Sequence, residues 1–289
     1  MRPDAIACTQ AYPCGMVADF KQQRNLRVPL VGVLTDYAPH LYWFHDTVDA
    51  YVVPSEQVKQ RFVTRGVHPE RVRVLGIPID PRFLEPVDRV ATAGRFGLNL
   101  EQPILLIMGG GSGFGQLREI VFSLDTLPHH CQFVVLAGTN RPLLSWLEGQ
   151  RFRHRVRAVS YTEEIPQLMS IATLLVSKPG GLTTSEALAK RLPLVIVNPI
   201  PGQEAYNARF LLSQGAAVQA VSVATVRQTV RDLLDSPEDL EALRQRNAEL
   251  AHPAAARDIA RLLCELADQF RGAPQPSADR PPRHAPVAP

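Results

Sequence analysis

The chain has 289 residues, 45% of them hydrophobic and 20% charged, and its formal net charge is +3. This length suits two α/β domains, while so small a net charge gives no electrostatic basis for binding nucleic acid. No apolar run reaches the ~20 residues that span a bilayer, the first residues lack a signal-peptide layout, and the 4 cysteines follow neither a disulfide nor a zinc spacing. We therefore expect a cytoplasmic protein whose cysteines are reduced and mostly buried.

Residues 1–85 alternate short apolar runs with helical segments, a pattern that predicts parallel βα units. Strands are expected at 4–8, 28–34, 49–53 and 72–76, and helices at 16–24 and 55–65. Because no strand with a glycine-rich turn precedes Asp4, this part is predicted to be an incomplete N-terminal domain. Such a domain leaves a sheet edge and an apolar face uncovered, so we expect the chain to associate or to be poorly soluble.

A proline-punctuated stretch follows, and residues 86–101 are predicted to connect the first domain to a second one. From 102 to 270, apolar runs alternate with helical periodicity, which is typical of a doubly wound α/β domain. Strands are expected near 103–110, 131–138, 156–160, 173–177, 192–197 and 215–219. Residues 271–289 are rich in proline and poor in apolar side chains, so we predict a disordered tail.

The glycine-rich stretch GGGSGFG (109–115) lies between a predicted strand and a predicted helix. Backbone amides in such a turn suit a phosphate group. The stretch is neither a Walker A loop nor the dinucleotide fingerprint, and no acidic residue ends the second strand, so a nicotinamide cofactor is not expected. Taken alone, a glycine turn that allows tight packing explains this stretch equally well.

Two further loops follow later strands. In SKPGGLTTSEAL (177–188), a set of helix-capping residues explains the Thr/Ser cluster by itself, and the alternative is that Glu186 binds the two hydroxyls of a ribose. In IPGQEAYNA (200–208), Gln203 and Glu204 open a helix with groups that suit sugar hydroxyls. Loops after successive parallel strands emerge at one edge of the sheet, so the three loops together favour a ligand site.

The stretches SKPGGLTTSEALAKRLPLVIVNPIPGQEAYNARFLLSQGAA (177–217) and LTDYAPHLYWFHDTVDAYVVPSEQVKQRFVTRGVHPERVRVLGIPIDPRF (34–83) resemble family 28 glycosyltransferases. The similar branch contains monogalactosyldiacylglycerol synthases and processive diacylglycerol glucosyltransferases, and the resemblance extends from Pro3 to about residue 270. It implies the GT-B fold, with two Rossmann-like doubly wound α/β domains, of which the N-terminal one is incomplete here. Members normally carry roughly another hundred residues before the part that matches Arg2, which is the size of a small domain.

The resemblance also implies a donor site for a UDP-sugar, with no metal and no cofactor. The helix turn that begins at Asn207 would support this site. Carried over by position, the site consists of Gly110, Gly111, Ser112 and Gly113 at the diphosphate, Tyr161 and Thr162 at the uracil, Glu186 at the ribose, Gly180, Gly181, Leu182 and Thr183 along the same pocket, and Gln203 and Glu204 at the sugar.

The implied reaction transfers a hexose, with inversion at the anomeric carbon, to the hydroxyl of a lipid, either diacylglycerol or a glycosyl-diacylglycerol. The resemblance also implies that the protein is located peripherally at the inner face of the cytoplasmic membrane. Amides and helix ends, rather than a metal, would stabilise the leaving diphosphate. The family's usual general base lies in the part that precedes Arg2, so Asp36, at the end of a strand, is our candidate for a base or acceptor contact.

Other residues near Asp36 receive structural interpretations. His40 and His45 are expected to pack or cap around Trp43, with a catalytic role as the alternative. Tyr42-Trp43-Phe44 is expected to form a buried core cluster, and contact with a lipid is the alternative. A solvated basic face is expected for the arginines at 61, 65, 71 and 73, in preference to a specific site for anionic lipid.

Two alternatives stay open. One is a truncated relative that binds a UDP-sugar and cannot transfer it. The other is a hydrolysing UDP-sugar epimerase, which shares the two-domain plan, although the KPGG turn and the PGQE loop match the transferase pattern better.

Overall fold

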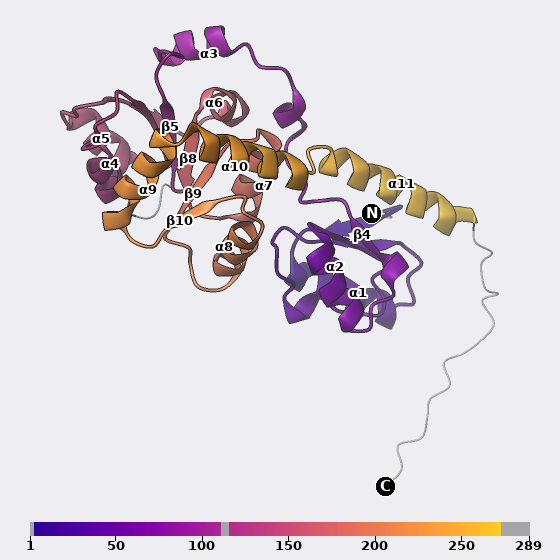
Figure 1. Ribbon diagram of the computed structural model, residues 1–289. Coiled ribbons are helices and arrows are strands. Elements are labelled where there is room, and N and C mark those ends of the chain that lie inside the picture. The colour runs from indigo at the N-terminus through magenta and orange to yellow at the C-terminus, as the bar shows by residue number, and fades with distance from the viewer. Residues whose placement is uncertain (1–2, 111–115, 273–289) are drawn as a thin grey trace, which may run out of the picture.

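The computed structural model describes residues 3–110 and 116–272, and it forms two lobes that are each built on a parallel β-sheet (Figure 1). The first lobe has 4 strands in the order β1-β2-β3-β4, and the second has 6 strands in the order β10-β9-β8-β5-β6-β7. Every pair of neighbouring strands is parallel. The predicted α/β class with parallel sheets is therefore confirmed.

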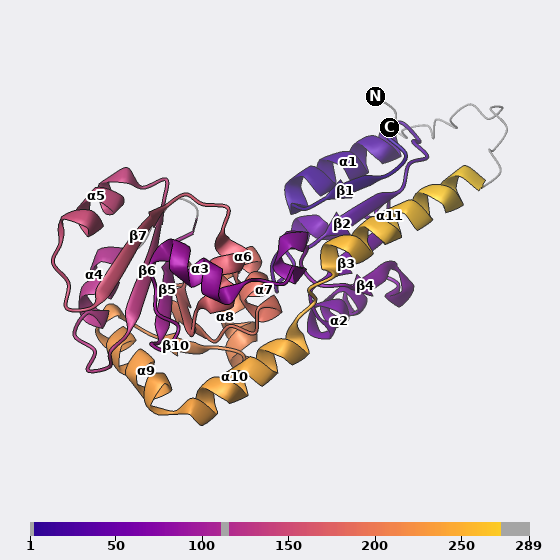
Figure 2. The ribbon, with the colours of Figure 1, turned by 90° about the horizontal axis from the view of Figure 1, so that it is seen from above.

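Helices cover the first sheet on both faces, so the expectation that a face of this sheet lies uncovered is wrong for the described residues. Alternate side chains of its strands point to opposite faces, so Leu30 and Tyr51 pack against α1 and α2, while Val31 and Val52 pack against α11 (Ala255–Gly272). Figure 2 shows α11 running along this sheet. The elements of this lobe are β1 (Ile6–Cys8), α1 (Ala11–Gln23), β2 (Leu30–Val33), η1 (Leu41–Trp43), β3 (Ala50–Val53), α2 (Glu56–Thr64), η2 (Pro69–Arg71) and β4 (Val72–Val74).

The second sheet is also buried between two layers of helices, which explains its continuous apolar runs such as ILLIM and LVIV. Helices α6, α7 and α8 cover one face, and α4, α5, α9 and α10 cover the other. The elements are β5 (Ile104–Met108), α4 (Leu117–Leu124), β6 (Gln132–Gly138), α5 (Arg141–Gly149), β7 (Arg155–Ser160), α6 (Ile165–Ile171), β8 (Leu174–Ser177), α7 (Gly181–Ala189), β9 (Leu194–Val197), α8 (Gln203–Ser213), β10 (Val218–Ala220), α9 (Val223–Asp235) and α10 (Pro237–Leu250).

The sequence predictions differ from the structure at two helices. Helix α1 begins at Ala11 and not at residue 16, because Pro13 lies in the first turn, where a helix tolerates proline. The predicted connector, residues 86–101, contains a helix, α3 (Arg89–Phe96), and the short helix η3 (Pro81–Leu84) lies just before it. The sequence analysis predicted neither helix. Asp88 caps α3 by accepting from the Ala91 N–H, and Gly97 ends it in the left-handed conformation.

The last helix, α11 (Ala255–Gly272), returns from the second lobe to the first (Figures 1 and 2). Its Ile259 and Leu262 share a buried cluster with Val31 and Val33, although the sequence places these residues with the second domain. No helix in the ranges 3–110 and 116–272 has the length and apolarity needed to cross a membrane. The chain thus passes between the lobes twice, once through residues near 76–88 and once through residues near 251–254.

Candidate functional site

The second sheet has a topological switch point between β5 and β8. Strands β6 and β7 lie on one side of this pair, and β9 and β10 lie on the other, so the loops that follow β5 and β8 diverge there. Ligands of doubly wound sheets bind in the crevice that such loops leave. Gly110, which has a φ of 76°, opens the first loop. Gly180 ends the second loop as the N-cap of α7, and Gly181 is the first residue of that helix. The predicted phosphate residues Gly111, Ser112 and Gly113 lie outside the described residues.

The helices α7 and α8 begin without a side-chain cap. Their N-cap residues are Gly180 and Gly202, whereas α2 and α5 are capped by Ser55 and Asn140. The capping role considered for the Thr/Ser cluster is therefore wrong, because the hydroxyls of Thr184 and Ser185 donate backward to the Gly181 carbonyl instead. No side chain therefore caps the first amides of either helix, and uncapped helix starts of this kind suit an anionic ligand.

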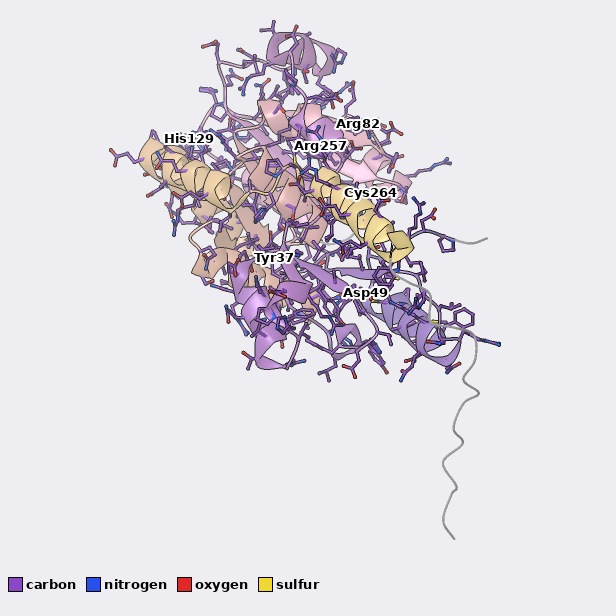
Figure 3. All side chains as sticks on the ribbon, turned by 90° about the vertical axis from the view of Figure 1, so that its right-hand side faces the viewer. Tyr37, Asp49, Arg82, His129, Arg257 and Cys264 are labelled. Atoms are coloured by element: carbon purple, nitrogen blue, oxygen red, sulfur yellow. The ribbon has the colours of Figure 1, made fainter. Side chains whose placement is uncertain are left out.

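The two lobes meet at the loop after β2, which lies against the starts of α7 and α8. A Cβ at Gly181 would come within 1.8 Å of the Thr35 carbonyl oxygen, so only glycine fits at this contact. Tyr37, which is labelled in Figure 3, belongs to the buried core of the second lobe. Its ring stacks on Phe210, with 4.2 Å between ring centroids. Burial raises the pKa of Tyr37 to about 12, and a hydrogen bond with Ser185 opposes that shift.

Asn207 joins the lobes through its side chain, which is fully buried. Its Oδ1 accepts from the Tyr37 N–H at 2.8 Å, and its Nδ2 donates to Asp36 Oδ1 at 2.9 Å and to the Pro179 carbonyl at 3.0 Å. One side chain therefore ties the loop after β2 to the loop after β8. The sequence analysis gave Asn207 only a supporting role, because its partners lie up to 171 positions away.

Asp36 faces a pocket of about 320 Å³ at the ends of β1 and β2, and Gln203 reaches the same pocket from α8. Burial raises the pKa of the Asp36 carboxyl, the hydrogen bond from Asn207 lowers it, and the charge of Glu204 raises it. The hydrogen bond from Asn207 engages Oδ1 of Asp36, one of the two oxygens through which a carboxylate accepts.

The predicted packing roles of the neighbouring histidines are confirmed: His40 caps η1, and His45 bonds the Tyr42 carbonyl. The predicted burial of the cluster at 42–44 is correct for Trp43, which is 5% exposed, and wrong for Tyr42, which is 55% exposed.

Glu186 lies on α7 beside the connector. Burial raises the pKa of its carboxyl to about 7, and the charge of Asp80 raises it as well. Asp80 in turn pairs with Arg82, which also contacts Glu163 directly after the predicted uracil residues. The sequence analysis missed Asp80 and Arg82, because no motif marks them and only the path of the connector brings them to this site.

The pKa of Glu186 predicts a pH-dependent penalty on stability. Between about pH 4.5 and about pH 7, the folded chain holds a proton that the unfolded chain has lost, so the free energy of unfolding falls as pH rises. Glu186→Gln removes this ionisation, and we expect it to stabilise the protein by up to about 3 kcal/mol above pH 7 and by little near pH 4.5. Urea unfolding at both pH values measures this, and an equal difference at the two values would contradict the prediction.

The other predicted donor residues line the same edge with less burial. Tyr161 and Leu182 are 67% and 51% exposed, and Thr162 accepts from the Glu164 N–H. Thr183 lies half-buried in the first turn of α7. Glu204 accepts from the Ile200 N–H at 2.8 Å, which fixes the loop before α8, while Gln203 is exposed. Within the described ranges, no group of three or more His, Cys, Asp or Glu residues is arranged to hold a metal ion.

Comparison with known structures identifies the same architecture. The chain superposes on MurG from Acinetobacter baumannii with a TM-score of 0.66 at 15% identity, covering 91% of this chain and 73% of that one. It superposes on the Neisseria meningitidis UDP-GlcNAc 2-epimerase, solved with bound UDP-GlcNAc, with a TM-score of 0.66 at 14% identity, covering 91% and 76%. For Anabaena HepE in complex with UDP, the TM-score is 0.61 at 14% identity, with 90% and 79% covered. The fold is that of GT-B proteins, as predicted.

Sequence comparison is more specific. Residues 1–79 match the model of monogalactosyldiacylglycerol (MGDG) synthase, and residues 104–262 match that of the glycosyltransferase family 28 C-terminal domain. The processive diacylglycerol beta-glucosyltransferase of Bacillus pumilus is 32% identical over 269 residues, which cover 92% of this chain and 70% of that protein. The Bacillus subtilis protein of the same name is 31% identical over 262 residues, covering 89% and 67%. The chain therefore belongs to glycosyltransferase family 28, in the branch of the monogalactosyldiacylglycerol synthases and processive diacylglycerol glucosyltransferases.

Proposed function

We propose that this protein transfers a hexose from a UDP-sugar to the hydroxyl of a lipid, diacylglycerol or glycosyl-diacylglycerol, with inversion at the anomeric carbon. The observation that carries the proposal is the identity of 32% over 269 residues to a relative named for that reaction. The uncapped start of α7 at the switch point and that of α8 after the neighbouring strand β9 support it, because they suit the diphosphate of the donor.

In this proposal the donor lies along the edge of the second sheet. Gly110 and the loop after it contact the diphosphate, and Glu186 binds the ribose hydroxyls through its two carboxylate oxygens. Gln203 and Glu204 contact the sugar. The remaining donor residues are Tyr161 and Thr162 at the uracil, Gly111, Ser112 and Gly113 at the diphosphate, and Gly180, Gly181, Leu182 and Thr183 along the pocket wall.

The acceptor hydroxyl approaches from the pocket that Asp36 and Gln203 line. Its oxygen attacks the anomeric carbon, the bond from that carbon to the diphosphate oxygen breaks, and Asp36 takes the hydroxyl proton. The negative charge that develops on the leaving UDP is stabilised by the first amides of α7 and α8, which are fixed before the reaction. The raised pKa of Asp36 is consistent with a general base, because it makes the carboxylate a stronger proton acceptor.

A lipid acceptor implies that the protein works at the surface of a membrane. We propose a peripheral location at the inner face of the cytoplasmic membrane. The described helices include none that could span it.

The epimerase alternative shares the fold, since the epimerase and MurG superpose on this chain with the same TM-score of 0.66. The fold thus does not distinguish the two activities. The sequence relatives favour the transferase, because proteins of 31–32% identity carry that name.

Calorimetric titration of UDP into residues 1–289 tests the donor site. We expect saturable binding, and Glu186→Ala is expected to weaken it at least about ten-fold, because a hydrogen bond to a charged group contributes about 1.5–3 kcal/mol. Glu70→Ala is the control for loss of a carboxylate, since the Glu70 side chain is 86% exposed and belongs to η2 in the first lobe.

Transfer is then measured with UDP-glucose and diacylglycerol dispersed in detergent micelles. Binding of UDP together with glucosylation of the lipid supports the proposal in full. Binding without transfer would identify a non-catalytic UDP-sugar-binding relative, and a folded chain that binds no UDP would contradict the donor site itself.

A further inference from the structure

Two ion pairs fasten the segment between the lobes to the loop after β7. Arg82, on η3, pairs with Glu163 at 3.3 Å, and Arg95, in the last turn of α3, pairs with Glu164 at 3.1 Å. The two glutamates directly follow the pair of residues that the proposed function places at the uracil, and they precede α6. We call residues 161–164 the uracil loop.

The two arginines approach this loop from ordered elements. Asp80 accepts the Arg82 N–H at 2.8 Å through Oδ1, and its Oδ2 accepts from the Arg82 guanidinium at 2.8 and 3.0 Å (Arg82 is labelled in Figure 3). Helix α3, which carries Arg95, packs against α6, and Arg89 at its start donates to the Ser170 carbonyl at 2.7 Å. Both guanidinium groups therefore extend from segments that are themselves fixed.

The uracil loop has little support from the core. None of its four residues is buried, and the Tyr161 side chain is 67% exposed. Within the loop, Thr162 Oγ1 accepts from the Glu164 N–H at 3.1 Å. Side-chain burial thus contributes little to holding this loop, and contacts from outside it gain importance.

The exposure of the two ion pairs indicates what they can do. The side chains of Arg82 and Arg95 are 44% and 49% exposed, and ion pairs between exposed side chains contribute little to global stability. Both pairs nevertheless reach one short loop, and a loop that is fixed before its ligand arrives binds with a smaller loss of conformational freedom. Their placement therefore fits a positioning role better than a role in stability.

We propose that Arg82 and Arg95 are positioning residues for nucleotide recognition, and that they hold the uracil loop in the geometry that discriminates uracil from cytosine. The two bases share one ring shape and differ in the hydrogen-bonding groups along one edge, so a loop that misplaces its own groups loses this distinction first. The inference rests on the proposed function, because it identifies what makes the donor site specific for a uridine nucleotide.

Titration of UDP and of CDP into the full chain tests the positioning role. The parent is expected to bind UDP at least about ten-fold more tightly than CDP. Arg82→Gln/Arg95→Gln is expected to weaken UDP binding at least about five-fold and to leave CDP binding within about two-fold, so the preference for UDP falls. Its melting temperature should stay near that of the parent, because the pairs that it removes are exposed.

Arg231→Gln/Arg244→Gln is the matched control. It also removes two arginines from exposed ion pairs, with Asp235 and Glu241, and these arginine side chains are 45% and 37% exposed. Each of these pairs lies within one helix, α9 or α10, so neither fastens one segment to another. The preference of this control for UDP over CDP is expected to equal that of the parent.

A charge exchange separates the ion pair from other effects of the substitutions. Arg95→Glu alone places a second carboxylate opposite Glu164, and we expect it to lower the preference for UDP at least about five-fold. Arg95→Glu/Glu164→Arg restores an ion pair of reversed polarity, and it is expected to return the preference to within about two-fold of the parent.

The inference would be overturned if the parent bound UDP and CDP equally, or if Arg82→Gln/Arg95→Gln kept the parent's preference. An equal loss of preference in the Arg231→Gln/Arg244→Gln control would also overturn it. Each of these results leaves the donor site in place, because UDP still binds. A folded parent that binds neither nucleotide would instead contradict the donor site and the proposed function with it.

Discussion

Replacing Asp36 by asparagine is expected to reduce the rate of sugar transfer by about 10²- to 10⁴-fold, which is the range that general bases contribute. The substitution is conservative, because an amide oxygen can still accept the hydrogen bond that Asn207 Nδ2 donates at 2.9 Å. It removes the ability to take a proton from the acceptor hydroxyl, so the rate should fall while the affinity for UDP stays within about two-fold. Steady-state transfer rates and UDP titration on the same protein measure the two effects.

Glu70→Gln is the control for a change of one surface carboxylate to an amide, since Glu70 is 86% exposed, and it is expected to be without effect. The raised pKa of Asp36 also predicts that the acidic limb of the parent's pH–rate profile lies above the ordinary aspartate range, because the base must be ionised to act. Full activity of Asp36→Asn would exclude Asp36 as the base and leave it a role in joining the lobes.

Asn207→Ala is expected to lower the free energy of unfolding by about 3–5 kcal/mol, because each buried polar group that loses its partner costs about 1–3 kcal/mol. Asn207 has three partners, and the Tyr37 N–H and the Pro179 carbonyl have no solvent at the lobe contact to replace it. Chemical unfolding measures the loss. Hydrogen exchange shows where the structure is weakened, because the Tyr37 amide loses its acceptor and should exchange faster in the variant than in the parent.

Asn247→Ala is a matched control for the loss of a buried asparagine. Asn247 is fully buried and donates to the Leu192 carbonyl at 2.9 Å, within the second lobe. Asn247→Ala should lower the free energy of unfolding by a smaller amount, about 1–3 kcal/mol. Exchange of the Tyr37 amide should then speed up by no more than this loss of global stability accounts for. If both variants gave the same loss and the same Tyr37 exchange, Asn207 would have no special role between the lobes.

Much of the fold was predictable because the relevant patterns are local. The apolar runs of β2, β3, β5, β6, β8 and β9 became buried parallel strands, and glycines at the strand ends marked the turns at the switch point. The start of α1 was not predictable from its Pro-Cys-Gly stretch. Helix α3 was missed because it is short and is stabilised by packing against α6, a contact that the local sequence does not show. The helix-capping interpretation of the Thr/Ser cluster failed for a related reason: the direction in which a hydroxyl bonds is decided by where the helix begins, and α7 begins at Gly181.

The sequence by itself determined the two domains of parallel βα units, the family and the stretch that contains the candidate donor residues. These features depend on periodicity, glycine turns and motifs, which involve residues close together in the sequence. Only the tertiary structure decided that Asn207 joins Asp36 to Pro179. It also decided that Glu186 is half-buried beside Asp80 and that α1 turns Met16 and Phe20 outward. These properties arise between segments far apart in the chain, and the burial of a charge or the exposure of an apolar side chain depends on which of those segments covers it.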